Sequence, residues 1–73
     1  MKVIYKNVLG GVVYTEENDD IPGLMAILKE SKTVKFGIWN YEVKSYNLEY
    51  YQIDDKSRKM KSELVIELKQ KIG

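Results

Sequence analysis

The sequence predicts a single α+β domain over residues 1–73, with elements in the order ββαββα and both helices packed on one face of an antiparallel sheet. Three observations lead to this prediction. A chain of 73 residues is too short for two domains of ordinary size. Its 44% hydrophobic and 32% charged residues are typical of a folded soluble domain. Two regions rich in β-branched and aromatic residues are each followed by a stretch typical of a helix.

The N-terminal segment predicts a β-hairpin. Residues 2–9 are rich in β-branched and aromatic types and predict a strand, and residues 12–15 predict a second, shorter one. Gly10 and Gly11 separate the two runs. Because a type I′ turn needs positive φ at both central residues, this glycine pair favours a two-residue turn.

A helix of three turns is predicted over residues 21–31, after a polar acidic loop. Asp19 or Asp20 can cap it, since a carboxylate accepts the free N–H groups of the first turn. Pro22 is tolerated there because its missing N–H has no partner within the helix. Gly23 would allow close approach to the sheet. The expected buried face consists of Leu24, Ile27, Leu28 and Ser31.

Residues 33–39 predict another strand. Its apolar residues alternate with Lys35, Gly37 and Trp39, so Trp39 is expected on the face opposite to Phe36. Asn40 is a plausible turn residue because it tolerates left-handed conformations.

The segment 43–53 allows two interpretations. A period of two places Tyr46, Leu48 and Tyr50 on one face of a strand, whereas helical spacing aligns Val43, Tyr46, Tyr50 and Ile53. Four tyrosines between positions 41 and 51 favour the strand.

After a turn over residues 54–57, the segment 58–72 predicts a C-terminal helix with Ser57 as its cap. Lys69 and Lys71 suit the negative end of the helix dipole. The apolar residues that recur every four positions are Met60, Leu64, Leu68 and Ile72. A competing strand pattern is present, because Leu64, Ile66 and Leu68 also alternate.

Composition excludes several kinds of chemistry. With no Cys, the chain has no disulfide, no thiolate metal ligand and no thiol nucleophile. With no His, its serines lack the usual activating base. The acidic loop is the one candidate for a hard-cation site, but the calcium-loop pattern is missing and a solvated loop is favoured. Its acids are Glu16, Glu17, Asp19 and Asp20. We therefore expect no enzyme, no metal and no cofactor.

The aromatic residues of the central region are the candidate binding residues. Adjacent Tyr50 and Tyr51 must point to opposite faces of a strand, so the core cannot cover every ring. Exposed Tyr and Trp supply large, rigid contact area with a polar tip. With their polar neighbours, the candidate residues are Trp39, Asn40, Tyr41, Tyr46, Asn47, Tyr50 and Tyr51.

The sequence thus predicts a non-enzymatic interaction protein that binds another protein or itself, with a homo-oligomer expected. Short, cysteine-free α+β chains without catalytic residues are frequent among phage-type accessory or inhibitor proteins, an association of chain type that rests on no motif of this sequence. The alternative is a module that binds nucleotides or single-stranded nucleic acid by stacking. Its phosphate contacts would be Lys56, Arg58, Lys59 and Lys61. No apolar run is long enough for a signal peptide or membrane span, so we expect a cytoplasmic protein without membrane contact.

Overall fold

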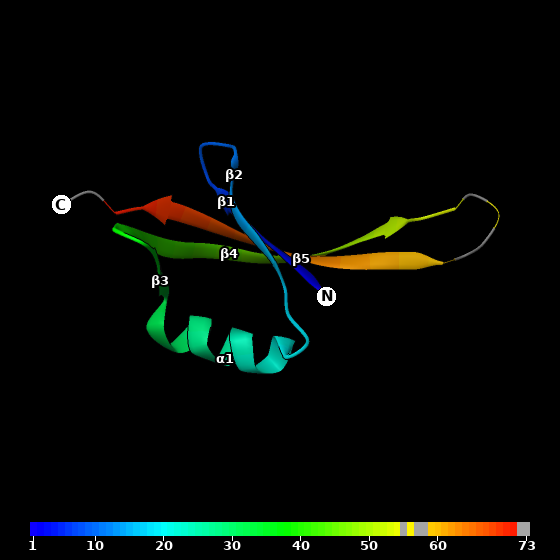
Figure 1. The fold of residues 1–73 in the computed structure, drawn as a ribbon, viewed down its shortest axis with the longest axis horizontal. Helices are drawn as coiled ribbons and strands as arrows, with labels where there is room; N and C mark the ends of the chain where they lie inside the picture. Colours follow the sequence, from blue (N-terminus) through cyan, green and yellow to red (C-terminus); the bar gives the residue numbers. More distant parts are fainter. Residues whose placement is uncertain (55, 57–58, 72–73) are drawn as a thin grey trace.

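The computed structural model describes residues 1–54, 56 and 59–71, and it shows a chain that is mostly strand (Figure 1). Among these residues α1 is the one helix. The elements in chain order are β1 (Lys2–Asn7), β2 (Val12–Glu17), α1 (Ile21–Ser31), β3 (Thr33–Phe36), β4 (Trp39–Gln52) and β5 (Met60–Gln70).

The five strands form one mixed sheet in the order β2-β1-β5-β4-β3. The last strand in the chain, β5, lies at the centre, parallel to β1 on one side and antiparallel to β4 on the other. The β1–β2 and β3–β4 pairs are antiparallel hairpins that form the two edges. The helix α1 connects these halves and lies on one face of the sheet (Figure 1); we call this the helix-side face and the other the outer face.

The predicted order ββαββα and the purely antiparallel sheet are therefore wrong. The segment assigned to a second helix over 58–72 contains the central strand β5. Residues four apart share a face in a strand as well as in a helix, so the recurrence of Met60, Leu64 and Leu68 does not separate the two. Ile66 separates the two interpretations, because it is buried together with Leu64 and Leu68. Three alternate residues share one face in a strand and not in a helix. The expected contributions of Ser57, Arg58 and Ile72 lie outside the described residues.

The predicted N-terminal hairpin is confirmed, but its turn is longer than expected. β1 ends at Asn7 rather than at residue 9, and residues 8–11 form the loop. The Gly10 N–H donates to the Asn7 carbonyl at 2.9 Å, and the Asn7 N–H donates to the Gly11 carbonyl at 3.0 Å. Both glycines have positive φ, at 103° and 88°, so the need for glycine was predicted correctly although the two-residue turn was wrong.

The helix matches its predicted bounds and its predicted cap. The Gly23 N–H donates to Asp20 Oδ1 at 3.1 Å, and Pro22 lies in the first turn. A Cβ on residue 23 would collide with the Asp20 carboxylate, so Gly23 makes room for the cap rather than for the sheet. Leu28 is buried as expected, whereas Ile27 is exposed.

The predicted strand 33–39 is two elements joined by a tight turn at Gly37 and Ile38. Gly37 has φ of 62°, which suits the first central residue of a type II′ hairpin turn. Trp39 begins β4 and pairs directly with Phe36, so the prediction that they lie on opposite faces is wrong. Asn40 is not in the turn, because it pairs with Lys35 within the hairpin.

The strand interpretation of residues 43–53 is confirmed, since β4 continues to Gln52. Tyr46, Leu48 and Tyr50 share the helix-side face, opposite Ile66, Leu64 and Ser62 of β5. A bulge between Val43 and Ser45 shifts the register by one residue. As a result Tyr41 points to the same face as Tyr46, although the two are separated by an odd number of positions.

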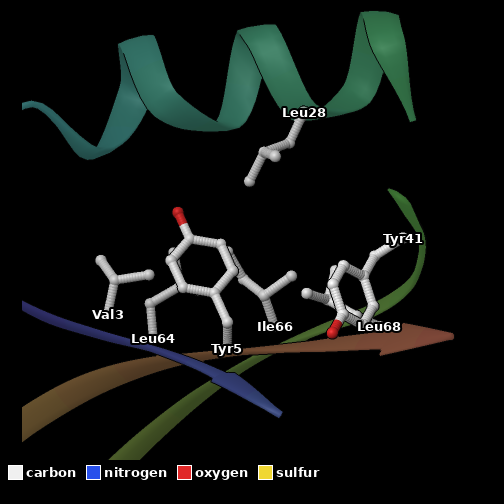
Figure 2. Packing of buried hydrophobic residues seen from close by; sticks show 7 residues of the cluster. All are labelled: Val3, Tyr5, Leu28, Tyr41, Leu64, Ile66 and Leu68. Atoms are coloured by element: carbon white, nitrogen blue, oxygen red, sulfur yellow. The ribbon is translucent and has the colours of Figure 1, made fainter. Parts of the chain in front are cut away.

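The core lies between α1 and the helix-side face, where Leu28 points from the helix toward Tyr5 and Ile66 (Figure 2). The sheet curls strongly around this core. The rings of Tyr14 on β2 and Phe36 on β3 have centroids 5.5 Å apart, although these edge strands would lie about 19 Å apart in a flat five-stranded sheet. The buried cluster consists of Val3, Tyr5, Leu28, Tyr41, Leu64, Ile66 and Leu68.

The molecule is elongated because β4 and β5 project beyond the rest of the sheet as a two-stranded ribbon (Figure 1). Its radius of gyration is 13.7 Å, against about 11 Å for a compact domain of this length. β1 reaches β5 only from Glu63 onward, so residues 60–62 of β5 pair with residues 50–52 of β4 and with no third strand from the described part of the chain. We call these two segments the arm.

The burial of Ile66 predicts a large loss of stability on truncation. Ile66 is 0% exposed at the centre of the sheet, so Ile66→Ala should lower the free energy of unfolding by about 2–5 kcal/mol through lost burial and a cavity. Ile27→Ala is the control, because Ile27 is 66% exposed and should change stability by about 0.5 kcal/mol or less. Urea unfolding measures both, and equal losses would contradict the assigned core.

Candidate functional site

All seven predicted binding residues lie on β4, but they do not form one surface. Trp39, Asn40 and Tyr41 lie at the start of the strand, while Tyr50 and Tyr51 lie near its other end. At about 3.3 Å per residue, positions 39 and 51 are about 40 Å apart. The structure therefore divides the set between two ends of the molecule.

At the first end, Tyr41 belongs to the core rather than to a surface. It is buried, and its ring lies 5.9 Å from that of Phe36. Trp39 is half-exposed beside the β3–β4 turn, and the β1–β2 turn lies at the same end of the sheet. We call the exposed apolar residues of these turns and their flanking strands the turn end: Val8, Leu9, Val12, Tyr14, Ile38 and Trp39.

At the second end, the helix-side face of the sheet continues past the helix without cover. Leu48, Tyr50 and Met60 are 53%, 60% and 58% exposed there, and we call these three residues the arm surface. Tyr46 is half-buried and joins the arm surface to the core. The sequence predicted that Leu48 lies between Tyr46 and Tyr50 on one face of a strand. Met60 was missed because it was assigned to a helix.

The edge of β4 at this end has no strand partner in the part of the chain that the structure describes. β3 pairs only with residues 39–42, so residues 44–52 are bonded to β5 on one side and open on the other. This free edge is about 30 Å long at about 3.3 Å per residue. Its extent could not be predicted from sequence, because it depends on where β3 ends.

Other sheet edges carry features that discourage further pairing. β2 has two acidic residues at its end, Glu16 and Glu17, and β3 has only four residues. The free edge of β4 has a bulge and Lys44 at its start, and after these it carries one charge, Glu49, and no proline. It is therefore the edge best suited to accept another strand.

The outer face of the arm differs from the arm surface. Tyr51 lies there directly opposite Lys61, and Asn47 and Glu49 precede it on β4. Lys56 and Lys59, in the loop that joins the two strands, are exposed. Three of the four predicted phosphate contacts thus gather at the tip of the arm, and the fourth, Arg58, lies outside the described residues.

Three of the four acids that the sequence assigned to the loop before α1 have structural partners. Asp20 caps the helix, Glu16 accepts a hydrogen bond from the Tyr5 hydroxyl at 3.1 Å, and the N-terminal ammonium lies 3.5 Å from Glu17 Oε2. Within the described residues, no group of three or more acids converges as a metal site would require.

A hollow of about 270 Å³ is lined by Lys2, Thr15, Glu16 and Glu17. It is smaller than most small-molecule sites, which occupy roughly 300–1,000 Å³, and it lacks their apolar lining.

Among the described residues, Tyr5 is the titratable group whose pKa departs clearly from its ordinary value. Its burial raises the pKa of the phenol well above the usual range, and the hydrogen bond from its hydroxyl to the Glu16 carboxylate raises the pKa further. The Tyr5 hydroxyl therefore stays protonated at neutral pH and serves as a hydrogen-bond donor in the core rather than as a base.

Comparisons with protein-family models, with curated proteins and with solved structures find no match. The described part of the chain contains no helix long and apolar enough to cross a membrane. The interpretation of the arm and of the turn end depends on their geometry.

Replacement of Tyr5 by Phe should show the pH dependence that its raised pKa implies. At neutral pH, Tyr5→Phe should lower the free energy of unfolding by about 1 kcal/mol through the lost hydrogen bond. Because the pKa of Tyr5 is higher in the folded chain than its usual 10.0, the contribution is complete below pH 10 and is lost as the pH rises toward the folded value.

The difference in unfolding free energy between wild type and Tyr5→Phe should therefore shrink above pH 10. Urea unfolding at a neutral and a strongly alkaline pH measures it. Tyr50→Phe is the control, since Tyr50 is exposed and its hydroxyl should contribute little at either pH. A difference for Tyr5→Phe that stays constant with pH would argue against this linkage.

Proposed function

We propose that this chain is a non-enzymatic protein-interaction module that contacts its partner through the arm surface and the free edge of β4. The observation that carries the proposal is the coincidence of the two: an unpaired strand edge over residues 44–52 borders exposed Leu48 and Tyr50. The free edge contains four of the seven residues that the sequence suggested: Tyr46, Asn47, Tyr50 and Tyr51.

Strand addition explains how such an edge would bind. The outward N–H and C=O groups of residues 44–52 can pair with an extended segment of another chain, and these main-chain bonds supply affinity. The alternate side chains supply specificity, because over residues 46–50 those on the helix-side face are aromatic or apolar while those on the outer face, Asn47 and Glu49, are polar. A partner strand with the same alternation would match both faces.

The instability of a two-stranded ribbon also supports this location. Isolated pairs of strands are marginally stable in water, and a third strand with an apolar face is usually needed. Among the described residues, 50–52 and 60–62 have no third strand beside them. A partner strand along β4 would supply it and would remove Leu48 and Tyr50 from water.

The turn end exposes more apolar residues than the arm surface does, but it lacks a free strand edge beside them. Val8, Leu9 and Ile38 lie in turns, so they present side chains without a continuous row of main-chain groups. The turn end can add contact area, but it has no edge along which a strand could extend the sheet.

The proposal that the protein is not an enzyme has its own support. The chain contains no Cys and no His. Tyr5 is held protonated in the core, and the acidic loop is engaged in capping and in hydrogen bonding. The arm surface consists of apolar and phenolic side chains, which suit contact rather than proton transfer.

Removal of the arm surface should weaken partner binding. The double variant Tyr50→Ser, Met60→Ser should lower the affinity for a captured protein partner about tenfold or more, as expected when aromatic contact residues are truncated. Because both side chains are exposed, the folded state should be retained, and circular dichroism checks this. Affinity purification with the tagged protein followed by binding titration is the measurement.

The matched control for this experiment is Leu9→Ser, Ile38→Ser, which removes two exposed apolar side chains from the turn end. Its capture should equal that of wild type. Loss of capture in this control and not in the arm variant would place the interaction at the turn end instead.

A second candidate function is binding of single-stranded nucleic acid or nucleotides at the tip of the arm. The observation in its favour is that Tyr51 lies opposite Lys61 and that Lys56 and Lys59 are exposed in the adjoining loop. A ring on which a base can stack, next to cations that contact phosphates, is typical of such sites. Trp39 lies at the far end of β4, so its fluorescence would not report binding there.

This candidate is tested with a labelled oligothymidine by fluorescence anisotropy at several salt concentrations. Binding should weaken with salt, and Lys61→Gln should reduce the slope of log K against log salt by about 0.7, the value for one phosphate contact on a single strand. Lys29→Gln on α1 serves as the control. Absence of binding at low salt would reject the candidate.

A further inference from the structure

We propose that a second copy of this chain occupies the free edge of β4, with the two β4 strands antiparallel about a two-fold axis at Leu48. The two five-stranded sheets would then form one continuous sheet across the dimer. This inference rests on the proposed function and names the partner. It follows from the side-chain pattern of residues 46–50, which matches itself when it is reversed about Leu48.

The helix-side face supplies the apolar half of the match. In an antiparallel pair centred on Leu48, the Leu48 side chains of the two copies lie opposite each other, and Tyr46 of each copy lies opposite Tyr50 of the other. All three residues share this face. Pairs of aromatic and aliphatic side chains directly opposite each other are the unit of sheet stabilisation. The exposed Leu48 and Tyr50 become part of a ladder that joins the two cores through Tyr46.

The outer face supplies the polar half. With the same centre, Asn47 of each copy lies opposite Glu49 of the other, so an amide that can donate faces a carboxylate that accepts. Ser45 lies opposite Tyr51 of the second copy on this same face, while Lys44 lies opposite Gln52, which belongs to the helix-side face. No like charges face each other anywhere between residues 44 and 52.

Neighbouring registers fit less well. A centre at Glu49 places the two Glu49 carboxylates directly opposite each other, which is destabilising. A centre at Asn47 places Tyr50 opposite Lys44, so Tyr50 loses its apolar partner. A register shifted by one residue from the one centred on Leu48 would place the apolar residues of one copy opposite polar residues of the other, because alternate residues face opposite sides of the sheet. Among these registers, the one centred on Leu48 matches both faces.

A second copy would also stabilise the arm. Each arm is a two-stranded ribbon, and in this dimer residues 50–52 of each copy lie beside residues 44–46 of the other copy's β4, so that the arm becomes part of a sheet in the order β5-β4-β4-β5. Sheets of three or more strands with an apolar face are stable where two strands are marginal. Domains below about 70–80 residues often obtain added stability from self-association.

The first experiment is sedimentation velocity on the full chain and on two variants of one residue. Wild type should be a dimer. Asn47→Glu places two carboxylates opposite each other twice per dimer and should raise the dimer dissociation constant by about 2- to 30-fold. Asn47→Lys creates two opposite-charge pairs instead and should leave the constant unchanged or lower it. Circular dichroism confirms that each monomer is folded.

The second experiment tests the register by oxidative cross-linking, for which the absence of Cys makes single-cysteine variants unambiguous. In the proposed register the Cα atoms of the two residues 48 lie about 4.5–5.5 Å apart, within the range that a disulfide spans. The two residues 51 lie about 20 Å apart. Leu48→Cys should therefore give a covalent dimer, and Tyr51→Cys, the matched exposed control, should not.

The outcomes separate this inference from the proposed function. A wild-type chain that stays monomeric at several hundred micromolar overturns the dimer, while loss of capture of a different protein by the arm variant would still support the interaction module. Equal cross-linking at positions 48 and 51, or equal effects of Asn47→Glu and Asn47→Lys, overturns the register. Dimerisation with the expected order of the two Asn47 variants and selective cross-linking at 48 supports it.

Discussion

Pairing of β5 along both of its edges is the constraint on which the rest of this structure depends. β5 holds β1 on one side and β4 on the other, and so it connects the two hairpins that α1 separates in the chain. Leu64, Ile66 and Leu68 face α1 from the centre of the sheet, and Val65 is buried on the outer face. Without β5 neither hairpin would have a core to pack against, because two strands with one apolar face do not exclude water.

The curl of the sheet follows from what lies on its helix-side face. Tyr5 contacts both Tyr14 and Phe36, and the edge strands β2 and β3 approach each other through the last two rings. These contacts close the sheet at this end of the core, where Leu68 is fully buried. Four aromatic rings, including that of Tyr41, thereby cover the core at one end, as the helix covers it in the middle. The other end has no such cover, and there β4 and β5 leave the core as the arm.

One strand therefore has two roles. The first part of β4 is an inner strand, paired with β3 and β5 and contributing Tyr41 to the core. Beyond the bulge at Val43 and Ser45 it becomes an edge strand with an apolar row on one face and a polar row on the other. The bulge preserves the helix-side orientation of this row, so the arm surface is a continuation of the core face rather than a separate patch. A partner on this edge would extend the same two layers that stabilise the monomer.

The amino-acid sequence by itself determined several local features of the chain: glycine with positive φ in the β1–β2 turn, the helix at 21–31 with its Asp20 cap, and the alternation of Tyr46, Leu48 and Tyr50 along one face. Each of these depends on residues within a few positions of one another. Only the tertiary structure decided that residues 60–70 form a strand, because Met60, Leu64 and Leu68 satisfy both periods and the choice came from hydrogen bonds to β1 and β4. The same long-range pairing decided which aromatic residues were exposed. Tyr41 is buried where the curled sheet closes, and Tyr50 is open where the sheet narrows to two strands, since exposure depends on neighbours that are distant in the chain.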